Sequence, residues 1–282
     1  MSRQYFTLIA GLPDILIDEA KMALTASSFR EELAGHLHPD DYQLIELFSL
    51  PIDQENIINI LQRNDKPFFQ GGIYTEEVLL DAIKEYQNLP HYMLTFIKNF
   101  QEEYRQFPQL SLPDEFMVMY YDYLKANSNP FIRAWAEFDQ NLRNLLIGLN
   151  SRKFGFKAEN YLLTDSLVTD EILKSNAPDF NLSREYPVVD ELLRIFENAN
   201  LLEREKGIDL LRWDFLDEST FFYYFTIERV IAYWIKLNIV ERWLKLDNEK
   251  GEKLFSKLLG ELENSFTFSE EFAINGGRKN AN

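Results

Sequence analysis

The sequence predicts an all-α fold, and three observations lead to this class. Prolines and acidic residues recur at positions typical of helix starts. The stretch from Ile208 to Lys250 contains neither glycine nor proline, and its second half reads as one long, aromatic-rich helix. Strand-like alternation bounded by tight Asn-Gly or Asp-Gly turns does not occur in the sequence. We therefore expect a multi-helix protein with a long C-terminal helix.

The N-terminal third carries the first helix signals. Residues 4–10 fit a short strand, and a helical pattern then runs from Pro13 to about Leu33. The next helix is expected to start at His38-Pro39-Asp40-Asp41, because proline and acidic side chains suit a first helical turn. Asp53 is predicted to be the N-cap of a helix at 57–61, and Thr75 the N-cap of a helix at 78–86. Between these two helices, residues 68–74 around Gly71-Gly72 are predicted to form a loop.

Prolines divide the middle of the chain into three predicted helices. Pro90 starts one that Pro108 ends, Pro113 starts one that runs to about Lys125, and Pro130 starts the third. This third helix, at 129–153, is the cleanest amphipathic segment of the chain. Its apolar face is made of Phe131, Trp135, Phe138, Leu142, Leu145 and Leu149.

Residues 150–181 have interrupted periodicity and predict a connection between two helical halves. We accordingly divide the chain into an N-terminal helical half at 1–150 and a C-terminal helical half at 151–274 that packs on it. The last residues, 275–282, are expected to form a disordered tail.

The C-terminal stretch has apolar residues at close to helical spacing: Phe221, Phe225, Ile231, Trp234, Ile235, Val240, Trp243 and Leu244. We expect Trp135 and Trp234, each on the apolar face of its helix, to be mostly buried. Trp135, Arg143 and Leu145 share their mutual spacing with Trp234, Arg242 and Leu244. This similarity fits either a repeated helical unit or two helices of similar register.

Composition excludes several functional classes. The chain carries 29 Lys and Arg against 46 Asp and Glu, a net charge of −17, which disfavours nucleic acid and anionic lipid as partners. It has no cysteine, which fits a reducing cytoplasm and excludes thiolate metal sites. The most apolar window, 221–240, contains Glu228, Arg229 and Lys236, so we expect no membrane insertion. Asp14 follows the first apolar run too soon for a signal peptide.

An enzyme is disfavoured because no constellation of catalytic residues stands out. His36 and His38 with Asp40 and Asp41 resemble half of a metal site, but the same residues suit a helix start better. The pair Gly71-Gly72 lacks the lysine and serine or threonine of a phosphate loop. We expect no catalytic site, no metal and no cofactor.

Three segments carry a resemblance to a known family. Residues 5–14 (YFTLIAGLPD), 137–145 (EFDQNLRNL) and 232–244 (AYWIKLNIVERWL), with Asp247 and Gly251, look like a bacterial family encoded beside V/A-type ATPase subunits and similar to the C subunit, whose eukaryotic counterpart is the d subunit. The resemblance implies a funnel-like or solenoid-like assembly of pseudo-repeated helical units. This chain is shorter than the archaeal relatives and has AGLP where they tend to carry an arginine-containing stretch.

The resemblance further implies a non-catalytic central-stalk component that couples the ATPase rotor shaft to the membrane ring. Such a protein is cytoplasmic, peripheral to the inner membrane through the complex, with the shaft subunits and the rotor ring as partners. On the polar helix faces, the interface candidates are Glu137, Asp139, Arg143, Glu241 and Arg242. The alternatives are a helical adaptor unrelated to the ATPase and, less favoured, an enzyme that uses His36 and His38.

Overall fold

The computed structural model describes residues 3–18, 22–164 and 166–247, and these residues form twelve α-helices and one 3-10 turn without a strand. The all-α prediction is confirmed. The predicted tail at 275–282 lies outside the described residues. In chain order the helices are α1 (Phe6–Ala10), α2 (Ala26–His36), α3 (Pro39–Glu46), α4 (Leu50–Gln62), α5 (Glu76–Glu85), α6 (His91–Gln101), α7 (Leu112–Lys125), α8 (Pro130–Phe154), α9 (Leu167–Lys174), α10 (Val188–Phe196), α11 (Leu201–Thr220) and α12 (Ile227–Asp247).

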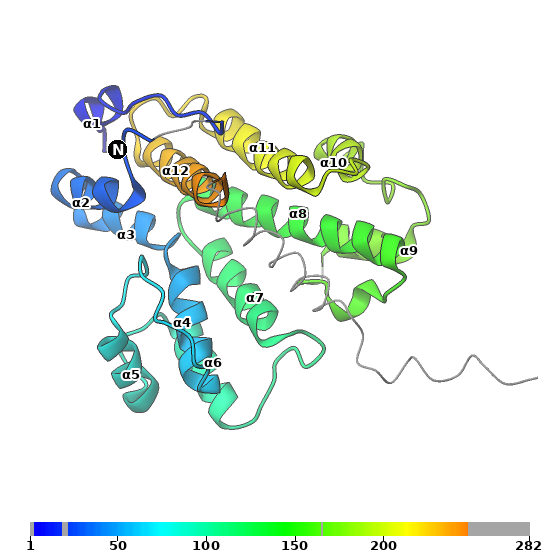
Figure 1. Ribbon diagram of the computed structural model, residues 1–282, viewed down its shortest axis with the longest axis horizontal. Coiled ribbons are helices and arrows are strands. Elements are labelled where there is room, and N and C mark those ends of the chain that lie inside the picture. Colours follow the sequence, from blue (N-terminus) through cyan, green and yellow to red (C-terminus); the bar gives the residue numbers. More distant parts are fainter. Residues whose placement is uncertain (1–2, 19–21, 165, 248–282) are drawn as a thin grey trace, which may run out of the picture.

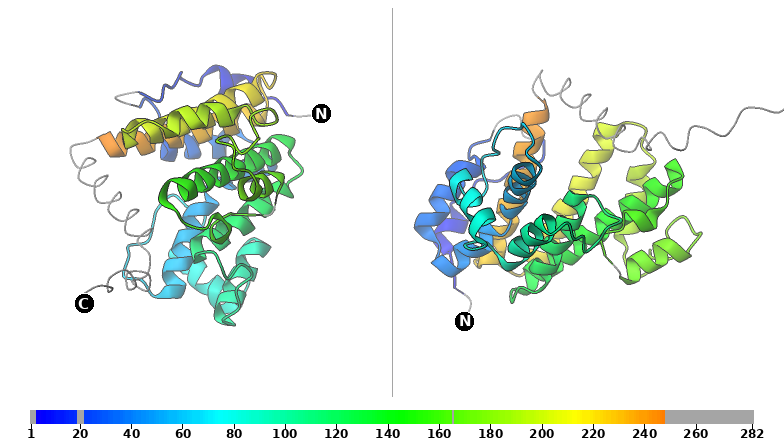
Figure 2. Two further views of the ribbon diagram at one scale, coloured as in Figure 1. Left: turned by 90° about the vertical axis from the view of Figure 1, so that its right-hand side faces the viewer. Right: turned by 90° about the horizontal axis from the view of Figure 1, so that it is seen from below.

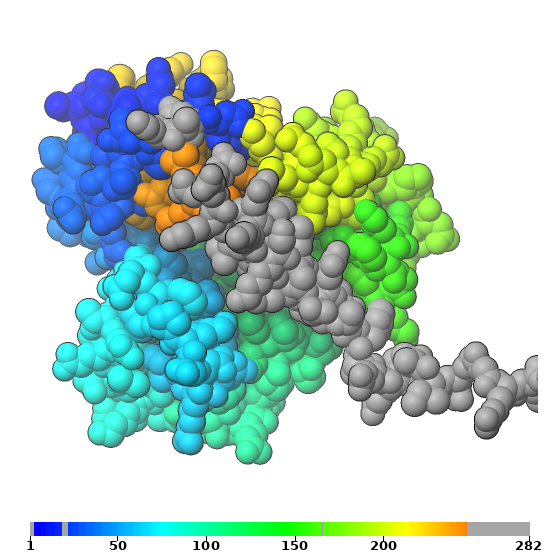
Figure 3. Space-filling model, in the orientation of Figure 1, coloured from blue at the N-terminus to red at the C-terminus, as the bar shows by residue number. Residues whose placement is uncertain are grey.

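The long helix α8 crosses the middle of the molecule. Helices α11 and α12 lie on one side of it, and α4 to α7 lie on the other (Figure 1 and Figure 2, left). Helix α12 also packs against α2 and α3, and the space-filling view shows these distant parts of the sequence side by side (Figure 3). The last described helix therefore joins the first ones in one packed unit.

Two hydrophobic clusters form the core, and α8 contributes to both. Its first turns supply Phe131 and Trp135 to a large cluster that also includes α12 and the N-terminal helices. Its later turns supply Leu142 and Leu149 to a smaller cluster shared with α9, α10 and the first half of α11. Trp135 and Trp234 are both buried, as predicted. The division into halves at 1–150 and 151–274 stays a prediction.

Most predicted helix starts are confirmed, because their signals are local. The Thr75 hydroxyl accepts a hydrogen bond from the Val78 N–H at the start of α5, and the Asn129 side chain caps α8 ahead of Pro130. Helix α7 runs over the predicted residues and starts with a proline in its first turn. Helix α8 ends at Phe154, and Gly155, which follows it, has a φ of 76°, a left-handed value that favours glycine.

The N-terminal prediction is wrong at two points. Residues 6–10 form the short helix α1 rather than a strand, and residues 11–18 are not the start of a helix. Helix α2 begins only after Thr25, which forms a capping box with Ser28. The segment before it lies against α12, where the Tyr233 hydroxyl donates to the Pro13 carbonyl oxygen at 3.1 Å. Its apolar side chains pack on the core without a helical backbone.

Two loops interrupt the predicted helices further on. Helix α6 ends at Gln101 instead of Pro108, because Glu103 takes a left-handed φ of 54° and the loop that follows is tied to the buried Glu115 carboxylate. The helix expected in the second half of 208–250 is α12, but Phe221 and Phe225 lie outside it in a turn. The predicted connection at 150–181 contains α9, which starts with a capping box of its own.

Asp53 does not cap a helix, contrary to the prediction. Helix α4 begins at Leu50, which places Asp53 inside its first turn with a fully buried carboxylate. That carboxylate accepts hydrogen bonds from the N–H groups of Ile73 (2.8 Å) and Tyr74 (3.2 Å) and so holds the predicted loop at 68–74. A Cβ atom on Gly72 would lie 2.2 Å from Asp53 Oδ1, so glycine is required at this close approach.

We expect Asp53 to make stability depend on pH. Burial raises its pKa to about 6 although two N–H groups and Arg30 act against the rise. A carboxyl whose pKa is higher in the folded than in the unfolded chain stabilises most below about pH 4, and this contribution is lost as pH rises through about 6. As pH rises from about 4 to 7, the wild-type protein should therefore lose about 3 kcal/mol of unfolding free energy that Asp53→Asn keeps, because asparagine does not ionise. Urea unfolding of both proteins measures the difference, and a constant difference contradicts the assignment.

Candidate functional site: a buried ionic network between helices

A buried ionic network lies where α7, α8, α11 and α12 meet. Its first centre is the buried Asp139 of α8. The Tyr121 hydroxyl of α7 donates to Asp139 Oδ2 at 2.5 Å, and Arg143 Nε donates to the same oxygen at 3.2 Å. Arg212 of α11 donates from Nε to Asp139 Oδ1 at 2.7 Å. Donors from three helices therefore hold both oxygens of this carboxylate.

The second centre is Asp209 of α11, which is also buried. Arg212 Nη1 donates to Asp209 Oδ1 at 3.1 Å, so this arginine bridges the two carboxylates. Asp209 Oδ2 accepts from Trp243 Nε1 at 2.7 Å and from the guanidinium of Arg242, both on α12. Arg212 thus links α8 to α12 through a chain of charge-assisted hydrogen bonds.

Sequence spacing explains how each helix contributes to the network. Asp139 and Arg143 are four residues apart and Asp209 and Arg212 are three apart, so each pair shares a helix face. On α8, Asp139 stands between residues of the large hydrophobic cluster and Leu142 of the smaller one. The network therefore occupies the junction of the two cores and bonds α8 to α7 and α11 there.

The electrostatics of Asp139 suit a structural role. Burial alone would raise its pKa, but the positive charges of Arg212 and Arg143 and the Tyr121 hydrogen bond hold the pKa of Asp139 well below its ordinary value. A general base works best with a pKa near the working pH. Asp139 stays ionised throughout the neutral range and serves as a fixed acceptor.

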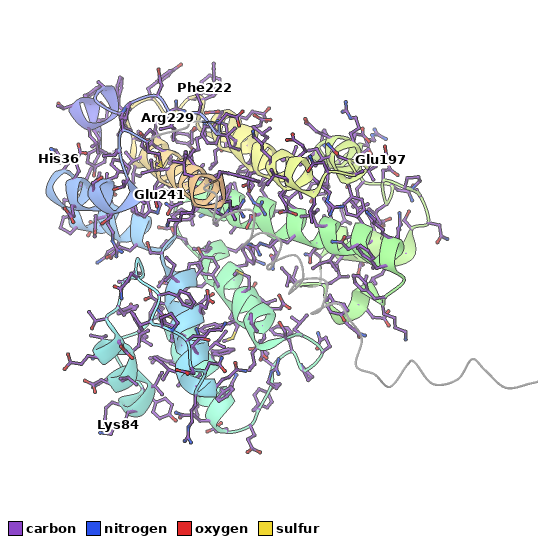
Figure 4. The ribbon with its side chains drawn as sticks, in the orientation of Figure 1. His36, Lys84, Glu197, Phe222, Arg229 and Glu241 are labelled. Carbon is purple, nitrogen blue, oxygen red and sulfur yellow. The ribbon has the colours of Figure 1, made fainter. Side chains whose placement is uncertain are left out.

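Three of the five predicted interface residues enter this network, and two do not. Asp139, Arg143 and Arg242 are brought together, and the side chains of Arg143 and Arg242 are 42% and 52% exposed. Glu241 lies elsewhere on α12, facing α2, where its Oε1 accepts from the Ala26 N–H at 2.6 Å (Figure 4). Glu137 is exposed on α8. Whether any of them contacts a partner stays a prediction.

Sequence reasoning missed Tyr121, Asp209 and Arg212. Asp209 and Arg212 stand in the apolar run IDLLRWDFL, and two opposite charges three residues apart within such a run indicate a buried pair. This signal was available in the sequence. Nothing in the sequence shows that Tyr121 reaches α8, because that contact depends on how α7 packs.

The histidines of the enzyme alternative serve helix ends. His38 is the N-cap of α3, where its Nδ1 accepts from the Asp40 N–H at 3.3 Å, and His36 Nδ1 lies 2.8 Å from the Glu32 carbonyl oxygen of its own helix. Among residues 3–18, 22–164 and 166–247, no group of three or more His, Cys, Asp or Glu side chains is placed to hold a metal ion. The capping interpretation of His38-Pro39-Asp40-Asp41 is confirmed.

A cleft of about 560 Å³ lies between residues 9–16 and the facing sides of α11 and α12. Lys236 enters it with its Nζ 2.5 Å from Asp217 Oδ1 and 4.5 Å from the centre of the Trp213 ring. Burial lowers the pKa of Lys236, while Asp217 opposes the change. Lys236 and Asp217 therefore neutralise each other inside the cleft, and this pairing favours a structural role for them over ligand binding.

The fold and the network together define a helical protein in which buried charged side chains bond helices to one another. No helix in the described part of the chain is long and apolar enough to cross a membrane. The chain belongs to the family described as "Protein of unknown function (DUF2764)", whose model matches residues 1–266. No curated protein and no solved structure matches the chain.

Proposed function

We propose that the protein is a non-catalytic central-stalk component of a V/A-type ion-translocating ATPase, similar to the C or d subunit of such enzymes. In this role it couples the rotor shaft to the membrane ring and lies in the cytoplasm, peripheral to the inner membrane through the complex. The proposal starts from the resemblance of residues 5–14, 137–145 and 232–244 to the family of C subunits.

The observation that carries the proposal is that these three segments are joined in space. The Tyr5 N–H donates to the Phe225 carbonyl oxygen at 2.7 Å, just before α12, and Tyr233 of α12 donates to Pro13. The segment at 232–244 reaches the one at 137–145 through the ionic network described above, from Arg242 to Asp139. The three segments that carry the resemblance therefore lie in one connected part of the fold and not at three separate places.

The network also suits a part that transmits force. Charge-assisted hydrogen bonds depend strongly on direction, so a network that links four helices at the junction of two cores resists sliding of one core on the other. A coupling component needs this stiffness. By contrast, His36 and His38 lie in helix-end contacts and give the enzyme alternative no support.

Co-purification with the ATPase and gene deletion test the proposal. We expect tagged protein from native membranes to bring down the shaft and ring subunits, and deletion of its gene to uncouple ATP hydrolysis from ion transport. Raised salt should slow association before it dissociates the assembled complex, because screened charges govern encounter more than affinity. A fully assembled and coupled ATPase in the deletion strain would overturn the proposal and favour the unrelated adaptor.

A further inference from the structure

The turn between α11 and α12 contains five consecutive aromatic residues at 221–225. Three of them point away from the core: Phe222 is 80% exposed, and Phe221 and Tyr224 are each 64% exposed. Phe6 of α1 is 53% exposed, and the centre of its ring lies 4.6 Å from that of Phe225 at the end of the same turn. We call Phe6, Phe221, Phe222 and Tyr224 the aromatic patch. Phe222 stands at the edge of the molecule in Figure 4.

The backbone beneath the aromatic patch is held in place. The Phe221 N–H donates to the Glu218 carbonyl oxygen at 3.3 Å, and the Tyr223 N–H donates to the Thr220 carbonyl oxygen at 2.9 Å. The Phe225 carbonyl oxygen accepts from the Tyr5 N–H, which ties the turn to the N-terminal segment. A partner that binds such a preordered turn loses little conformational entropy in ordering it.

Solvent exposure of adjacent large aromatic side chains indicates a contact surface. Each of these rings could bury a large apolar area, and folded proteins rarely leave several such rings together in water without a function. Aromatic side chains are also enriched among the residues that dominate protein interfaces. The aromatic patch therefore has the composition of an interface core.

The surrounding charges select the kind of partner. Asp214 and Glu218, on the last turns of α11, are exposed next to the turn, while Asp217 is paired with Lys236 and Arg229. The chain as a whole carries a net charge of −17. Both an anionic bilayer and a second copy of this chain would be repelled by this charge. A protein surface with basic residues around an apolar groove is complementary to it.

We propose that the aromatic patch docks into an apolar groove, edged by basic residues, on a protein partner. Phe222 is the central anchor of this contact, and Asp214 and Glu218 meet the basic edge. The inference does not depend on the proposed function, because it specifies the chemistry of the partner and not its place in an ATPase.

Site-specific photocrosslinking tests the proposal. A photoreactive phenylalanine analogue replaces Phe222 in the full chain, expressed in native cells, and the crosslinked product is identified by mass spectrometry. The captured protein is then purified, and its affinity for the wild-type chain and for each variant is measured. We expect Phe222→Ser to weaken binding at least about tenfold, as for an interface anchor. Phe154→Ser is the matched control, since this ring is 58% exposed at the far end of α8, and it should leave binding unchanged.

The outcomes separate this inference from the proposed function. Capture of an ATPase component with the expected loss of affinity supports both. Capture of another protein with the same loss supports the docking site and counts against the ATPase role. The inference is overturned if Phe222 crosslinks to lipid, to a second copy of the chain or to nothing. It is also overturned if Phe222→Ser and Phe154→Ser weaken binding equally. Co-sedimentation with phosphatidylglycerol vesicles provides a second check, and binding that requires Phe222 there would also overturn it.

Discussion

Replacing Asp139 with alanine is expected to lower the free energy of unfolding by about 3 to 5 kcal/mol, because removal of one member of a buried ion pair leaves uncompensated charge behind. Arg212 would lose its bond to α8, and the buried Tyr121 hydroxyl would lose its acceptor. An unsatisfied buried hydroxyl adds a cost of its own. Urea unfolding followed by circular dichroism measures the change at neutral pH.

Glu137 provides the matched control for this experiment. It is an acidic residue on the same helix and is exposed. Glu137→Ala should change the unfolding free energy by no more than about 0.5 kcal/mol. A double-mutant cycle of Asp139→Ala with Tyr121→Phe should give a coupling of about 0.5 to 3 kcal/mol. If Asp139→Ala cost no more than Glu137→Ala, the network would not hold the two cores together.

Local signals account for the part of the fold that the sequence predicted. The side chains of His38, Thr75 and Asn129 accept hydrogen bonds from N–H groups two or three residues later in the sequence, so a short stretch of sequence specifies these caps. The amphipathic pattern of α8 is equally local and predicted its boundaries within one residue at each end.

Long-range contacts account for the part that the sequence did not predict. Asp53 looks like an N-cap, yet its partners are Ile73 and Tyr74 in a loop some twenty residues away. Phe221 and Phe225 fit a helical period, but they lie in a turn whose end is bonded to the Tyr5 N–H, more than two hundred residues earlier in the chain. Tertiary contacts override local preference at such positions.

The candidate site shows the same division. Asp139 and Arg143 could be paired from their spacing of four residues, and that pair exists. The bond from Arg212 to Asp139 needs α11 to pack beside α8, and the bonds from Arg242 and Trp243 to Asp209 need α12 to pack beside α11, so no spacing within one helix reveals them. Glu241 was selected for its charge, and its bond to the Ala26 N–H depends on the fold in the same way.

Truncation of Trp234 should strongly destabilise the packing of α12. Its ring is buried against Phe29, with 6.2 Å between the ring centres, in the cluster that joins α12 to the N-terminal helices. We expect Trp234→Ala to lower the free energy of unfolding by about 3 to 5 kcal/mol, the usual cost of the cavity left by a buried aromatic ring. Thermal and urea unfolding of the purified variant measure this loss.

Trp234→Phe distinguishes the packing of the ring from its polar group. The Trp234 indole N–H is buried and has no hydrogen-bond partner among the described residues, so its removal relieves a cost of about 1 to 3 kcal/mol. Phenylalanine should therefore recover most of the stability that alanine loses. Phe222→Ala, which removes an exposed ring, is the control and should alter stability by no more than about 0.5 kcal/mol. If Trp234→Ala were as mild as Phe222→Ala, α12 would not be anchored to the N-terminal helices through this ring.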